Sequence, residues 1–208
     1  MNRLKNSFCY LSGPMERTTD NGESWRNWIT PFLKSKGIVV LDPCNKPKTT
    51  LGNCADESQE AWEKLKKLKS QGNFDELSSS MRAIRNVDLR LTDKSDFFIV
   101  YWDKRLHPVG TVNEIAIAVQ QKKPVLMMCE EGVKDLQNWF FGAIPKELFF
   151  DSWLELKKYL VHVDEDENVD HLGRWQLFDY EFIGGLVGVE QLEDFSVRPA
   201  IGYGVKPK

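Results

Sequence analysis

Short apolar runs that alternate with amphipathic stretches constrain the fold of this chain more than any other feature. The clearest run is Phe97–Trp102, which is six residues long and lies between two aspartates. Similar runs stand at Phe8–Leu11, Ile38–Leu41 and Pro124–Cys129. Runs of this length that end at turn residues are typical of buried strands. The sequence therefore predicts several strands that are covered on both faces.

Helical periodicity fills the segments between these runs. Glu23–Lys36 repeats its apolar residues at three- and four-residue steps and is followed by Gly37, while Val112–Gln121 follows the third predicted strand. A strand, a helix and a strand in succession form the unit of a parallel sheet. We therefore predict an α/β fold, with an open flavodoxin- or Rossmann-like parallel sheet flanked by helices.

The remaining segments predict how this fold is decorated. A helical insertion is expected at about 44–87, with helices at 56–69 and 74–86, and further helices at 134–141 and 152–160 flank an extended piece at 148–150. Residues 1–163 are predicted to form the α/β domain and residues 164–208 an irregular C-terminal extension. The acidic run at its start, 164–167, is expected to be a solvated loop. Trp25 and Trp28 are expected in the core.

Composition excludes several classes of partner. The chain has 28 Lys and Arg against 31 Asp and Glu, a formal net charge of -3, so it lacks the basic excess typical of proteins that bind long nucleic acids. No apolar stretch approaches the roughly 20 residues of a membrane span. Four cysteines without a CxxC pair, and an N-terminus without a secretion signal, indicate reduced thiols and a cytoplasmic location. The three histidines lack metal-ligand spacing, so no metal is expected.

Polar and small residues cluster where the predicted strands end. Ser12-Gly13-Pro14-Met15 follows the first strand, Asp103 follows the third, and a loop then leads to Gly110-Thr-Val-Asn-Glu114. Ligands of open α/β sheets bind outside the carboxyl ends of the strands. The first loop lacks the glycine-rich phosphate fingerprint, so a dinucleotide cofactor is not expected.

Glu114 has two interpretations. Thr111-Val-Asn-Glu114 fits a capping box, in which Thr111 caps the helix and Glu114 reciprocates. A carboxylate in the first helical turn is also held ionised by the helix dipole, which suits a nucleophile. The predicted core stripe of this helix points Glu114 away from the core, toward a cleft; its members are Val112, Ile115, Ala116 and Val119.

Three segments in order resemble the nucleoside 2-deoxyribosyltransferase family. They are Tyr10-Leu-Ser-Gly-Pro-Met15, the stretch from Asp88 to Asp96, and Gly110-Thr-Val-Asn-Glu-Ile-Ala-Ile-Ala118 followed by Lys123-Pro124-Val125. The resemblance covers roughly the first 130 residues. It implies that Glu114 is the nucleophile and that Asp88 donates a proton to the departing base. The implied reaction cleaves the N-glycosidic bond of a 2-deoxyribonucleoside or nucleotide through a covalent glycosyl ester, and it needs no cofactor.

Other residues of these segments are expected to contact the substrate. Gly13 would allow close backbone approach, and Tyr10 or Met15 would offer an apolar surface beside Ser12 and Pro14. Gly110 belongs to the same motif, and Asp103 or Asn113 would supply a polar contact. Asp96 can serve the site or hold the turn into its strand, and Asp88 can alternatively be a solvated residue at a helix end. Asp103 can alternatively initiate a loop.

One position departs from the family pattern. Members that act on free nucleosides have an aspartate six residues before the nucleophile, and relatives that hydrolyse nucleoside monophosphates have a serine there, whereas this chain has Pro108. A base as acceptor would make the enzyme a transferase, and water would make it a hydrolase. A non-catalytic nucleotide-binding module and a flavodoxin-like interaction protein are the alternatives. The resemblance also implies a homo-oligomer, with the C-terminal extension as a plausible contact.

Overall fold

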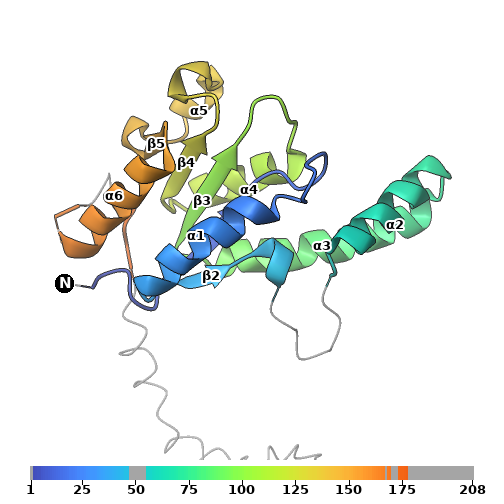
Figure 1. Ribbon diagram of the computed structural model, residues 1–208, viewed down its shortest axis with the longest axis horizontal. Coiled ribbons are helices and arrows are strands. Elements are labelled where there is room, and N and C mark those ends of the chain that lie inside the picture. The colour runs from blue at the N-terminus through green and yellow to red at the C-terminus, as the bar shows by residue number, and fades with distance from the viewer. Residues whose placement is uncertain (1, 47–54, 167, 170–172, 178–208) are drawn as a thin grey trace, which may run out of the picture. The chain divides into compact units, whose positions relative to one another are not determined.

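A five-stranded parallel sheet forms the centre of the computed structural model, which describes residues 2–46, 55–166, 168–169 and 173–177 (Figure 1). The strands are arranged in the order β2-β1-β3-β4-β5. Their bounds are β1 (Phe8–Ser12), β2 (Val39–Leu41), β3 (Phe97–Trp102), β4 (Val125–Cys129) and β5 (Phe149–Phe150). The α/β class with a parallel sheet is confirmed, and the third predicted strand has the observed bounds.

The strand order changes direction between β1 and β3. From β1 the chain passes outward to β2, then returns across the sheet to β3 and continues to β4 and β5. β1 and β3 pair directly, with Ser12 opposite Val100. A reversal of this kind opens a crevice at the carboxyl ends of the two neighbouring strands, where α/β proteins bind ligands. The end of β1 and the loop after β3 therefore meet at this point.

Helices cover both faces of the sheet. α1 (Glu23–Ser35) and α6 (Trp153–Glu165) lie in front of it in Figure 1, and Trp25 of α1 stacks on Trp153 of α6. α3 (Phe74–Lys94) and α4 (Val109–Gln120) contact each other and lie behind. Right-handed crossovers between parallel strands require this division. No helix among the described residues is both long and apolar enough to cross a bilayer.

The predicted helix at 134–141 is replaced by two shorter pieces. η2 (Val133–Asp135) is a single 3-10 turn and α5 (Asn138–Phe141) a short helix, separated by Leu136 and Gln137 in extended conformation. Leu136 is buried, and the extended backbone at this point brings its side chain into the core. The other short elements are η1 (Pro43–Asn45) and η3 (Lys146–Leu148).

The helical insertion forms a hairpin with a core of its own. α2 (Gln59–Ser70) packs on the first half of α3 around Trp62, Leu65, Leu68 and Ile84. The second half of α3 packs on the main core through Val87 and Leu91. α3 is therefore continuous to Lys94, eight residues beyond its predicted end, because its apolar residues serve two cores in succession. Asp88 lies inside this helix, just after the point where its apolar residues change from the hairpin core to the main core.

Three predictions about burial are wrong. Asp164, expected in a solvated loop, is buried within α6, where it accepts a hydrogen bond from Leu4 N at 3.0 Å and pairs with Lys36. Trp28 is 51% exposed, although its ring contacts Trp153 of α6. The core also does not end at residue 163, since Val169 and Trp175 are buried in it. Most of the predicted extension lies outside the described residues.

Arg26 is a buried charge that fixes the first loop. It is 1% exposed, and its guanidinium donates hydrogen bonds to the carbonyl oxygens of Leu11, Gly13 and Gly22. Its Nε lies 3.6 Å from Asp42 Oδ1. A buried charge is tolerated only when it is paired and its donors are satisfied. Arg26 of α1 thereby holds both ends of the loop that follows β1.

Replacing Arg26 with Met should lower the free energy of unfolding by about 3–5 kcal/mol, because three carbonyls and the Asp42 carboxylate lose their buried partner. Lys34→Met removes the same charge from an exposed position of α1 and should change it by less than about 0.5 kcal/mol. Urea unfolding of the two variants measures the difference. Equal losses would contradict this account of Arg26.

Candidate functional site

The Glu114 carboxylate is bound by two hydroxyl groups from β1. Tyr10 Oη donates to Glu114 Oε1 at 2.9 Å, and Ser12 Oγ donates to Glu114 Oε2 at 2.5 Å. Both donors are fully buried, while Glu114 is half-buried. Tyr10 and Ser12 point to the same face of the sheet because strand side chains alternate. The two segments of the sequence that predicted a site are therefore in direct contact.

The capping box predicted for Thr111 and Glu114 is not formed. α4 begins at Val109, its N-cap is Pro108, and no side chain caps it, because both carboxylate oxygens of Glu114 are taken by β1. Gly110 to Glu114 thus belong to the first turns of the helix rather than to a turn before it. The buried stripe also differs from the predicted one, consisting of Thr111, Ile115 and Ala118.

A cavity of about 520 Å³ opens beside Glu114. Its walls come from the loop after β1, from the α2–α3 hairpin and from the start of α4. The predicted site residues that line it are Gly13, Pro14, Met15, Asp88, Gly110, Asn113 and Glu114. One part of the wall is apolar, formed by Trp62, Met81 and Ile84. The cavity thus combines an apolar surface, which can hold a planar base, with several carboxyl groups, among them the predicted Asp88 and Glu114.

Asp88 belongs to a buried ionic cluster that the sequence did not indicate. Lys46 Nζ lies 2.7 Å from Asp88 Oδ1 and also contacts Glu57 Oε2. The side chains of Lys46 and Glu57 are each 3% exposed and that of Asp88 is 13% exposed. Glu57 lines the same cavity as Asp88 and Glu114. Three carboxyl groups and one ammonium group therefore lie at this end of the sheet.

Burial raises the pKa of each of these carboxyl groups. For Glu57, burial and the charge of Asp88 raise the pKa from 4.5 to about 7. Burial raises the pKa of Asp88, although Lys46 opposes the effect. Burial also raises the pKa of Glu114, against the two hydroxyl donors, which lower it. The pKa of Lys46 is lowered by burial but raised further by its two carboxylate partners, so it remains charged.

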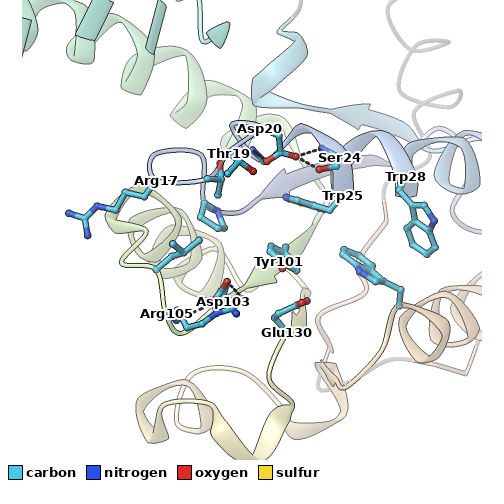
Figure 2. Close-up of a pocket in the computed structure, with 15 residues that line it drawn as sticks. Arg17, Thr19, Asp20, Ser24, Trp25, Trp28, Tyr101, Asp103, Arg105 and Glu130 are labelled. Carbon is cyan, nitrogen blue, oxygen red and sulfur yellow. Dashed lines mark hydrogen bonds and ion pairs between the residues drawn. The ribbon is translucent and has the colours of Figure 1, made fainter. Parts of the chain in front are cut away.

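Four predicted residues do not line the cavity: Tyr10 and Ser12 contact it only through Glu114, whereas Asp96 and Asp103 lie elsewhere. Asp96 precedes β3 at the opposite edge of the sheet, where its Oδ2 accepts a hydrogen bond from Phe8 N at 2.7 Å. Asp103 lines a neighbouring cavity of about 740 Å³ and binds Arg105 (Figure 2). Arg105 also pairs with Glu131. The arginine lowers the pKa of Asp103. Asp96 therefore holds the amino-terminal ends of β1 and β3 together, and Asp103 holds the loop that leads to α4 in place.

The neighbouring cavity is lined by aromatic rings of α1, β3 and α6. The Trp25 ring stacks at 5.7 Å on both Tyr101 and Trp153, and Trp28 contacts Trp153 at 5.6 Å (Figure 2). Gly13 permits this packing, because a Cβ there would lie 2.9 Å from the Trp25 ring. Pro14 and Arg17 line both cavities, so the first loop forms the wall between them.

Lys46 and Glu57 are the residues that sequence reasoning missed. Both lie in the insertion between β2 and α2, where they have no motif spacing and no periodicity. The only signal was that Asp88 needs a cationic partner once it is buried. Within the part of the chain that the structure describes, no group of three or more His, Cys, Asp or Glu is arranged to hold a metal ion.

Comparison with solved structures supports the fold. A 2-deoxyribosyltransferase from Bacillus psychrosaccharolyticus matches with a TM-score of 0.50 and 14% identity, over 74% of this chain and 92% of that one. A conserved protein from Enterococcus faecalis matches with a TM-score of 0.40 and 16% identity, over 76% of this chain and 88% of that one. No family model and no curated protein matches the chain. The first match establishes a shared α/β fold, and that neighbour is an enzyme.

Stability should depend on pH through Glu57. Its pKa is about 7 in the folded protein, against 4.5 ordinarily, so the folded state binds more protons than the unfolded state between these values. Its contribution to the free energy of unfolding should therefore decrease as pH rises through this window, by up to about 1.4 kcal/mol per pH unit.

Urea unfolding of the wild type and of Glu57→Gln between pH 4.5 and 8 measures this contribution as the difference between the two curves. Glu60→Gln, at an exposed position one turn further along the chain, is the matched control and should keep the wild-type slope. A wild-type-minus-Glu57→Gln difference that stays constant across the window would contradict the raised pKa.

Proposed function

We propose that this protein cleaves the N-glycosidic bond of a 2-deoxyribonucleoside or its 5′-monophosphate, with Glu114 as nucleophile and Asp88 as proton donor. The observation that supports it most is that these two carboxyl groups line one cavity in different surroundings. Glu114 accepts hydrogen bonds from two hydroxyl groups, whereas Asp88 lies beside a second carboxyl group, Glu57. Two carboxyl groups in different environments can divide the roles of nucleophile and acid.

The first step forms a glycosyl ester. A Glu114 oxygen attacks the anomeric carbon of the sugar while the carbon–nitrogen bond to the base breaks. The electron pair of that bond goes to the ring nitrogen of the base, which takes a proton from Asp88 or carries one already. Tyr10 and Ser12 hold the attacking carboxylate in place, which lowers the entropic cost of reaching the transition state.

The second step releases the sugar. Another base, or water, attacks the anomeric carbon from the opposite face, the ester bond breaks, and Asp88 accepts the proton that the incoming group loses. Two displacements at one carbon retain its configuration. With a base as acceptor the protein is a pentosyltransferase, and with water it is an N-glycoside hydrolase.

Recognition of a 5′-phosphate is proposed for the outer part of the cavity. Pro108 offers no side-chain donor there, but the exposed guanidinium groups of Arg17 and Arg85 line the cavity. Arg85 also lies near Asn113 Oδ1, at 3.4 Å. Guanidinium groups suit phosphate geometry, so these residues favour a nucleotide over a free nucleoside. We also propose that the protein forms a homo-oligomer and that it is located in the cytoplasm.

Replacing Glu114 with Ala should reduce base release by on the order of 10³-fold or more, because the ester cannot form. The assay incubates the protein with each 2-deoxyribonucleoside and each 5′-monophosphate, with and without a free base, and separates released and exchanged base by chromatography. Glu60→Gln should retain wild-type activity. Saturable binding of these compounds without base release from the wild type would instead favour a binding module.

Asp88→Asn should reduce turnover by about 10²–10⁴-fold with an ordinary base, since the leaving group then departs without a proton. With N7-methylated 2′-deoxyguanosine the loss should be much smaller, because the base already carries a positive charge in the nucleoside and departs neutral without a proton from Asp88. Comparison of kcat/KM for the two substrates measures the difference. Equal losses on both substrates would contradict proton donation by Asp88.

A further inference from the structure

The insertion supplies the cavity with a buried cluster of charged groups. Lys46 follows η1, Glu57 precedes the N-cap residue of α2, and Asp88 lies in the middle of α3. The Lys46 ammonium contacts both carboxyl groups, and the side chains of Lys46 and Glu57 are 3% exposed. Buried charges destabilise a fold unless they are fully compensated. Here one cation faces two carboxyl groups.

The buried charges around the cavity do not cancel. Glu57, Asp88 and Glu114 come from three different segments, and the buried cationic groups that act on them are Lys46 and Arg26. The other charged or titratable residues that line the cavity are at exposed positions, and they are Glu16, Arg17, Arg85 and His107. The Arg26 guanidinium is already bound by three carbonyl oxygens and lies near Asp42. One cation therefore remains for three carboxyl groups. Two carboxylates that share a site do not both ionise readily, so a proton is retained.

We propose that Glu57 and Asp88 hold one proton jointly beside Lys46, which makes Glu57 and Lys46 positioning residues that keep Asp88 able to donate a proton at neutral pH. This inference rests on the proposed function, in which Asp88 protonates the departing base. The value of about 7 for the pKa of Glu57, raised by burial and by Asp88, agrees with a proton that stays in the pair near neutrality.

Over the two steps, the Glu57–Asp88 pair gives up one proton and takes one back. In the first step the shared proton passes from the Asp88 carboxyl to the ring nitrogen of the base, which leaves the Glu57–Asp88 pair without a proton and with a second negative charge beside Lys46. In the second step the acceptor base or water gives up a proton to Asp88, and the pair returns to its starting state. Glu114 loses its negative charge in the ester and regains it on release.

A purely structural role makes a different prediction. If the cluster only fastened the α2–α3 hairpin to the sheet, its loss would reduce folding or turnover equally at all pH values. A shared proton makes the two positioning residues act in opposite directions. Without the Glu57 carboxylate the pKa of Asp88 should fall, and without the Lys46 ammonium the pKa values of both carboxyl groups should rise.

The test compares the pH dependence of kcat/KM between pH 5 and 9 for the wild type, Glu57→Gln, Lys46→Met and the exposed control Glu60→Gln, with the nucleotide that the wild type cleaves best. The alkaline limb should move to lower pH by about one unit or more in Glu57→Gln, which lowers activity at pH 8 about tenfold while activity at pH 5 changes little. In Lys46→Met it should move to higher pH, and in Glu60→Gln it should not move. An unmoved limb in Glu57→Gln overturns the proposal.

A second measurement needs no turnover. The carboxyl carbon signals of 13C-labelled protein, followed by NMR from pH 4 to 9, should show Glu57 and Asp88 titrating together near neutrality in the wild type and Asp88 titrating at lower pH in Glu57→Gln. If Lys46→Met fails to fold, Lys46→Met combined with Glu57→Gln keeps the charge balance and should restore folding. Joint titration without any base release would overturn the proposed function alone, and independent titration with base release would overturn the shared proton alone.

Discussion

The hydrogen bonds from Tyr10 and Ser12 to Glu114 are the contact on which the site depends. They join the end of β1 to the first turns of α4, at the place where the strand order reverses. Because both donors are fully buried in β1, the carboxylate is fixed relative to the sheet. Arg26 then fixes the start of the loop after β1 by binding the carbonyl oxygens of Leu11 and Gly13. The cavity wall formed by this loop and the Glu114 carboxylate are therefore both held in place relative to β1.

The surroundings of Glu114 and Asp88 differ, which explains how two carboxyl groups in one cavity can have different tendencies to hold a proton. Glu114 receives two hydrogen bonds that favour its charged form, while Asp88 lies beside a cation and a second carboxyl group. Asp88 lies in the part of α3 that packs on the main core, between Val87 and Leu91 in the sequence, so packing of this helix holds the acid in place. The helical insertion is thus part of the site, since it supplies Lys46, Glu57 and Asp88.

The sequence predicted the parts of this arrangement that depend on local patterns. The bounds of β3 follow from six apolar residues between Asp96 and Asp103, and the residues at the carboxyl ends of β1 and β3 could be named because parallel strands end at one edge. It could not choose between a cap and a free carboxylate for Glu114, because Thr111-Val-Asn-Glu114 fits both. The Lys46–Glu57–Asp88 cluster was missed because its members are joined only by tertiary contacts. The exposure of Trp28 was missed because helical spacing places Trp25 and Trp28 on one side of α1 but does not show how far each ring is covered.

The central claim is that Glu114 becomes covalently bound to the sugar. The most direct measurement is mass spectrometry of protein quenched with acid during turnover of a 2-deoxyribonucleotide, followed by proteolysis and sequencing of the peptide that contains Glu114. The account predicts a mass increase of one 2-deoxyribosyl group, with its 5′-phosphate where the substrate carries one, on Glu114 in the wild type and none in Glu114→Ala. Turnover with no adduct, or an adduct on a different residue, would contradict it.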